Sequence, residues 1–211
     1  MYSQKYLSDK IWAGEYLGQF GALGIAQDNY DDSGCGKEET FTYVMTLYSA
    51  IGNFVSQLKR FRFWFVPFLL SAIFDFRRIM NEILDKRFYE GSTPERKEAF
   101  VAYLLFLDKV SFSSKYKSMA IEIGLEVFLD ELTPPPSFLL VVARLSSVSE
   151  DLGYSFKKIA LSEIRNENTQ KEVGWRTICR VARLIGDREM IAKSAPLADS
   201  QDVLLKSGVS V

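Results

Sequence analysis

The stretch "FTYVMTLYSAIGNFVSQL", residues 41–58, decides the fold class of this 211-residue chain. Its apolar residues recur at alternating spacings of three and four, at Phe41, Val44, Tyr48, Ile51, Val55 and Leu58. Side chains spaced in this way lie along one stripe of an α-helix. The same spacing would suit a coiled-coil seam, but it covers fewer than three heptads and is too short to indicate one. We therefore predict an amphipathic helix that packs through this stripe.

The rest of the chain repeats the helical pattern between proline and glycine breaks. Pro67 suits the first turn of a helix that Gly91 can end, and Thr93 with Pro94 can begin the next one. No stretch shows the strict alternation, bounded by turn signals, that indicates a half-buried strand. The sequence therefore predicts an all-α fold with eight or nine helices.

The stretch "LTPPPS", residues 132–137, is the clearest break. Three consecutive prolines remove three backbone donors and hold the chain extended. We therefore predict two packed helical lobes, an N-terminal lobe of residues 1–133 and a C-terminal lobe of residues 134–211.

Three further signals predict helix ends in the C-terminal lobe. Ser137 can cap a helix that Gly153 closes. Thr169 and Glu172 have the spacing of a capping box, which predicts a helix over residues 170–185. From Pro196 onward we expect little structure beyond a turn near residues 203–205.

The composition lacks the residues and motifs of the common enzyme classes and therefore favours a binding function over catalysis. The chain has no histidine, which removes the commonest general base and metal ligand. It also lacks a phosphate-binding glycine loop and a zinc-type cysteine pair, so we expect no enzyme activity, catalytic residue, cofactor or metal. Its two cysteines and the absence of a signal peptide predict a cytoplasmic location, and the longest apolar run, residues 63–74, is too short to span a membrane.

The main candidate site is the row formed by Arg176, Arg180 and Arg183. These residues share one edge of the predicted helix, which belongs to a segment, residues 154–186, with seven Lys and Arg against three Glu. Guanidinium groups make paired hydrogen bonds to phosphate oxygens, so the row suits RNA binding through the phosphate backbone. The alternative is an ordinary solvated face on which Glu172 pairs with Arg176.

A second basic cluster is interleaved with aromatic residues in "KRFRFWF", residues 59–65. Lys59, Arg60 and Arg62 could hold a nucleic-acid backbone while the aromatic rings stack on bases. The alternative is that the rings belong to the core, because aromatic residues at a helix junction are commonly buried.

Two acidic patterns offer other functions. "DNYDDSGCGKEE", residues 28–39, has the length of a calcium-binding loop, but Tyr30 stands at a ligand position and Ser33 replaces the turn glycine. We therefore interpret this stretch as a solvated acidic linker, and a calcium-binding loop is the alternative. Glu122, Glu126 and Asp130 form an acidic row, which suits a solvated face or a partner surface for arginines of another subunit.

The stretch "ICRVARLIGDREM", residues 178–190, resembles the BH3 helix of cell-death regulators through Gly186 and Asp187. That pattern requires leucine where this chain has Ala182, and a hydrophobic residue where it has Glu189. We interpret the match as a coincidence of two residues that are common at a helix end.

These observations favour a non-enzymatic, self-associating helical protein that binds RNA through its phosphates with little sequence specificity. Small helical viral proteins that sequester RNA, such as silencing suppressors, share this profile as a class. The alternative is a protein assembly module that does not bind nucleic acid. In both cases we expect a homo-oligomer.

Overall fold

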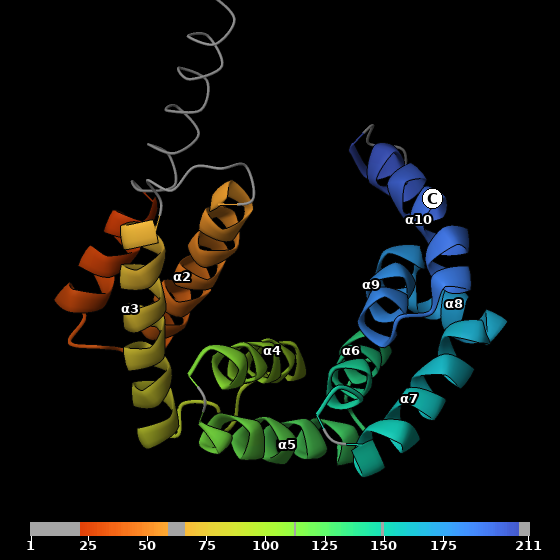
Figure 1. The fold of residues 1–211 in the computed structure, drawn as a ribbon, viewed down its shortest axis with the longest axis horizontal. Helices are drawn as coiled ribbons and strands as arrows, with labels where there is room; N and C mark the ends of the chain where they lie inside the picture. The colour runs from red at the N-terminus through yellow and green to blue at the C-terminus, as the bar shows by residue number, and fades with distance from the viewer. Residues whose placement is uncertain (1–21, 59–65, 112, 149, 207–211) are drawn as a thin grey trace, which may run out of the picture. The chain divides into compact units, whose positions relative to one another are not determined.

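The computed structural model describes residues 22–58, 66–111, 113–148 and 150–206 (Figure 1). These residues form ten helices and no strand: residues 22–32, α2 (Lys37–Leu58), α3 (Val66–Asp85), α4 (Pro94–Ser111), α5 (Ser114–Leu129), α6 (Pro135–Leu145), α7 (Glu150–Arg165), α8 (Glu167–Val173), α9 (Trp175–Ile185) and α10 (Arg188–Lys206). The predicted all-α fold is confirmed, whereas the predicted count of eight or nine helices is too low.

The helix predicted over residues 41–58 is α2, which packs against α3. Phe41 and Val44 of the predicted stripe are buried, but Val55 is exposed. The buried stripe runs instead through Leu47 and Phe54, each of which directly precedes a residue of the predicted stripe. The period was therefore predicted correctly, and the buried face is rotated relative to the prediction.

Tyr30 fixes the helix of residues 22–32 to α3. Its hydroxyl donates to the Glu82 carboxylate, which also accepts a hydrogen bond of 2.7 Å from Lys86 Nζ. Burial, together with hydrogen bonds to Cys35 and Glu82, raises the pKa of the Tyr30 phenol. Tyr30 therefore remains protonated and keeps donating across the physiological pH range.

Contacts between helices divide the chain into two compact units, residues 1–90 and 91–211. The triple proline lies inside the second unit, where Pro135 and Pro136 occupy the first two positions of α6. Proline is favoured there because a first-turn residue has no helical acceptor for its N–H. The predicted two-lobe arrangement around residues 134–136 is not shown, and the division at residue 134 stays a prediction.

Helix α6 is the centre of the second unit. Seven of its eleven residues are buried, as expected for a helix that is apolar on all sides. It packs against α4, α5, α7, α8 and α9. Ser137, predicted as its cap, is buried within the helix because α6 begins earlier, and Gly153 lies inside α7 rather than at a helix end.

A break at Gly174 separates α8 from α9. Gly174 has a φ of +80°, in the region that favours glycine, and its N–H donates to the Gln170 carbonyl at 3.2 Å. The predicted capping box of Thr169 and Glu172 is therefore wrong. The cap of α8 is Asn166, whose side chain accepts from a backbone N–H in its first turn.

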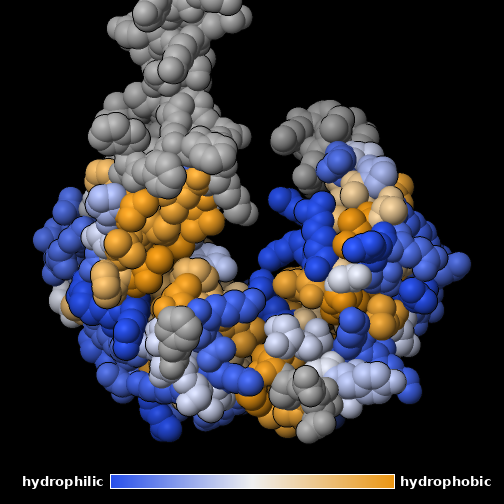
Figure 2. Space-filling view, viewed as in Figure 1, coloured by the Kyte–Doolittle hydropathy of each residue, from blue (hydrophilic) through white to orange (hydrophobic). Residues whose placement is uncertain are grey.

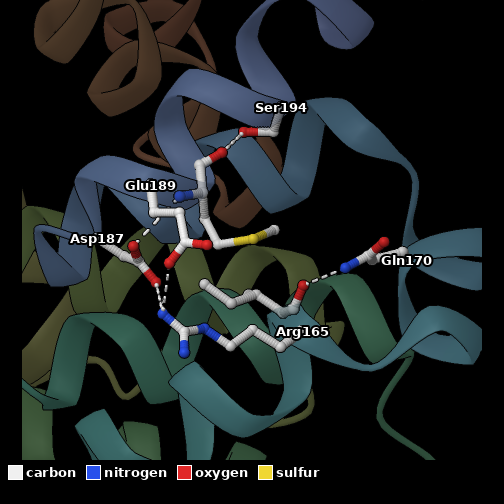
Figure 3. Close-up of polar contacts among 7 residues, drawn as sticks. Arg165, Gln170, Asp187, Glu189 and Ser194 are labelled. Carbon is white, nitrogen blue, oxygen red and sulfur yellow. Dashed lines mark hydrogen bonds and ion pairs between the residues drawn. The ribbon is translucent and has the colours of Figure 1, made fainter.

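The junction between α9 and α10 is a tight turn at Gly186 and Asp187 (Figure 3). Gly186 ends α9 with a φ of +76°. The Asp187 carboxylate accepts from the Met190 N–H at 3.2 Å, so it caps α10, and its other oxygen accepts from Arg165 Nη2 at 3.1 Å. The Gly-Asp pair that resembles the BH3 pattern thus ends one helix and begins the next.

Helix α10 continues through Pro196, where we expected little structure. Met190 and Ala198 are buried, and the Ser194 hydroxyl donates to the Met190 carbonyl at 2.5 Å. Packing against α9 outweighs the hydrogen bond that proline removes. This helix and the break at Gly174 account for the underestimated helix count.

A substitution at Gly153 tests how closely α7 packs against the end of α6. A Cβ atom at Gly153 would lie 2.6 Å from the Ser146 carbonyl oxygen, a backbone atom that cannot rotate away. We expect Gly153→Ala to lower the free energy of unfolding by about 1–3 kcal/mol. The matched control is Gly52→Ala in α2, which has open space at its Cβ and should stabilise by about 0.5–1 kcal/mol. Urea unfolding measures both, and equal effects would contradict the packing.

Asp187 tests the α9–α10 junction. Asp187→Ala removes the α10 cap and the contact with Arg165, so we expect the free energy of unfolding to fall by about 1–2 kcal/mol. Arg165→Ala should cost less than about 1 kcal/mol, because Arg165 is half exposed and Asp187 keeps its backbone donor. Chemical denaturation of the two variants makes the comparison, and an unchanged Asp187→Ala variant would contradict the assigned cap.

Candidate nucleic-acid interface

The arginine row lies on the solvent side of α9. Ile178, Cys179, Val181, Ala182 and Ile185 form the buried side of this helix. Arg176, Arg180 and Arg183 are all exposed. At about 100° per residue, the three arginines fall within about 60° of arc, and their Cα atoms span about 10 Å along the helix. The fold therefore presents the predicted row outward as one continuous edge.

The charge of this edge is not compensated within α9, which carries no acidic residue. Within the described part of the chain, Arg180 and Arg183 form no ion pair. The predicted pairing of Glu172 with Arg176 assumed one continuous helix, whereas Gly174 places these two residues on different helices. Arg183 lies in the last turn, where a cation interacts favourably with the helix dipole.

Helix α10 brings one basic side chain, Lys193, to the residue that precedes the row. Lys193 Nζ lies 5.5 Å from the centre of the Trp175 ring, whose residue precedes Arg176. Arg188 is exposed at the start of α10. Strongly hydrophilic surface gathers on the side of the second unit where α9 and α10 lie (Figure 2). The Arg165 guanidinium, in contrast, contacts the carboxylates of Asp187 and Glu189.

Lys193 was not predicted as part of this site, because the last helix was predicted to end at residue 185 and no helix was expected to bring Lys193 back against Trp175. A signal was present in the sequence: Met190, Ser194 and Ala198 recur at spacings of four, which favours a helix with one small or apolar face. That face is the buried one in the structure.

The second predicted cluster, Lys59, Arg60 and Arg62, lies outside the described residues. Its contribution to a nucleic-acid interface stays a prediction. The arginine row of α9 is therefore the candidate site that the structure describes.

The acidic patterns do not form a metal centre in the described residues. Residues 28–32 are helical and Tyr30 is buried, so residues 28–39 do not form the twelve-residue loop that a calcium site would need, and the solvated linker that we favoured is shorter than predicted. Among the described side chains, no three His, Cys, Asp or Glu residues gather closely enough to hold a metal ion. Glu126 of the acidic row accepts a 2.7 Å hydrogen bond from Lys97. None of the helices in the described ranges is long and apolar enough to cross a membrane.

Comparison with known proteins adds no family to this description. No protein-family model, no curated protein and no solved structure matches the chain. The function is therefore inferred from the site itself.

Proposed function

We propose that this chain is a non-enzymatic, self-associating helical protein that binds RNA through its phosphate backbone with little sequence specificity. The contact is made by Arg176, Arg180 and Arg183. One observation carries the proposal: the row projects from the solvent side of α9, and Arg180 and Arg183 have no carboxylate partner among the described residues.

The chemistry of the row favours phosphates as its ligands. The guanidinium group is planar, stays charged in any environment and makes two parallel hydrogen bonds to phosphate oxygens. The opposite side of α9 is buried, so the backbone that carries the row is held in place. When RNA binds, only the arginine side chains have to become ordered, because the helix backbone is already fixed.

The surroundings of the row favour backbone contact over base recognition. Trp175 is the aromatic residue of α9, and its ring packs against the core cluster while Lys193 approaches it. It is therefore not a free platform for base stacking. Contacts to phosphates position a protein on RNA without reading its sequence. A role like that of small helical viral proteins that sequester RNA in the cytoplasm, such as silencing suppressors, is the class that we expect.

The salt dependence of RNA retention tests this function. Each phosphate contact on single-stranded nucleic acid contributes about 0.7 to the slope with which the logarithm of the binding constant falls against the logarithm of the salt concentration. Three arginines therefore give a slope of about 2, so RNA binding should weaken about twentyfold between about 50 and about 200 mM salt. We expect the triple variant Arg176→Ala, Arg180→Ala, Arg183→Ala to lose this part of the slope in a mobility-shift assay.

A variant with the same change in charge provides the control. Lys109→Ala, Lys115→Ala and Lys117→Ala remove three positive charges from α4 and α5 of the same unit. This variant should keep the slope of the wild-type protein. Equal loss of slope in both variants would contradict a localised site, and no retention of RNA at any salt concentration would favour the assembly module.

A further inference from the structure

Helix α5 presents an acidic edge to solvent. Glu122 is exposed, and Glu126 is about half exposed, with a side-chain exposure of 43% beside Lys97. Asp130 follows the last helical residue, and its carboxylate is held by the Leu132 N–H at 3.0 Å. Leu129 is 73% exposed on the same edge. Leu129 therefore adds an apolar contact point to an edge that is otherwise acidic.

The acidic edge of α5 and the basic edge of α9 have the same spacing. Starting from Glu122, α5 has a second carboxylate four positions later, a leucine at seven and Asp130 at eight. Starting from Arg176, α9 has a second arginine four positions later, a third at seven and Leu184 at eight. Leu184 is also exposed. The two edges therefore match in length, oppose each other in charge and carry an apolar residue at the same end.

The complementary groups do not meet within one chain. Glu122 has no ion pair in the described residues, and neither have Arg180 and Arg183. Among the side chains that the structure describes, Glu126 is paired only with Lys97 and keeps a side-chain exposure of 43%, and both edges are exposed on the same unit, so the acidic edge of one copy complements the basic edge of another. Like charges within each edge prevent α5 from pairing with α5 or α9 with α9.

We propose that α5 of one copy docks lengthwise along α9 of the next copy. The two helices run in the same direction, because this alignment places Leu129 beside Leu184 and Asp130 beside Arg183. The opposite direction separates the two leucines by the length of the helices. Because the surfaces in contact differ, the assembly grows head to tail or closes into a ring.

This interface goes beyond RNA binding and does not depend on it. It occupies the arginine row, so a neighbouring copy and RNA compete for α9. The acidic edge, in contrast, takes part only in assembly. Variants in α5 therefore separate the two activities.

Charge reversal of each edge tests the interface by sedimentation velocity. The acidic-edge variant is Glu122→Lys with Glu126→Lys, and the basic-edge variant is Arg180→Glu with Arg183→Glu. We expect the wild-type protein to associate and each variant alone to sediment as a monomer. An equimolar mixture should associate again, because the reversed α5 of one variant meets the reversed α9 of the other.

The control is Lys157→Glu with Lys158→Glu, which makes the same charge change as the basic-edge variant on the exposed side of α7 and should leave association intact. Circular dichroism verifies that each variant is folded. If a reversal prevents folding, Glu122→Gln with Arg183→Gln replaces it and should weaken association severalfold. A monomeric wild-type protein, or reversed variants that associate alone, would overturn the proposal. It is also overturned if the folded variants fail to associate when mixed, or if the control variant loses association as strongly as the edge variants do.

RNA retention by the acidic-edge variant separates this inference from the proposed function. The variant keeps the arginine row, so it should bind RNA at least as well as the wild-type protein. If the wild-type protein assembles but neither it nor any variant retains RNA, the proposed RNA binding is contradicted, whereas the proposed interface between copies is not.

Discussion

The burial of one side of α9 against the core of the second unit is the constraint on which the site depends. Ile178, Val181 and Ile185 can leave water only if the opposite side of the helix faces solvent. Burying an unpaired guanidinium group is far too costly to allow the reverse orientation. The same hydrophobic contacts that stabilise the unit therefore fix the direction in which Arg180 and Arg183 project.

The two ends of α9 determine how firmly this row is held. Gly174 and Gly186 adopt positive φ angles and separate α9 from its neighbours. Asp187 then begins α10 and engages Arg165 of α7 (Figure 3). The charges at this junction compensate each other, whereas Arg180 and Arg183 of α9 have no ion-pair partner among the described residues. Arg165 therefore stabilises the fold through its carboxylate partners, whereas Arg180 and Arg183 can contact a ligand. A negatively charged partner suits these two side chains best.

Local periodicity made part of this structure predictable. The spacing of apolar residues predicted the all-α fold and the position of α2, and it placed the arginines on the exposed edge of α9. The break at Gly174 was missed, because a single glycine inside a helical pattern looks the same whether the helix tolerates it or ends there. Helix α10 was missed because Pro196 argued against a helix, although the spacing of Met190, Ser194 and Ala198 favours one. Packing against α9, which the spacing does not reveal, decides between these two signals. The rotated face of α2 has the same origin, since the choice between Val55 and Phe54 depends on α3.

Nuclear magnetic resonance of the arginine side chains tests the central claim most directly. Titration of the isotope-labelled protein with a short single-stranded RNA should shift the Nε–Hε signals of Arg180 and Arg183. The signal of Arg165, which contacts Asp187 and Glu189, should stay in place. Shifts of equal size at Arg165, Arg78 and Arg87, which are paired with carboxylates, or no shift in α9 at saturating RNA, would contradict a phosphate-binding edge on this helix.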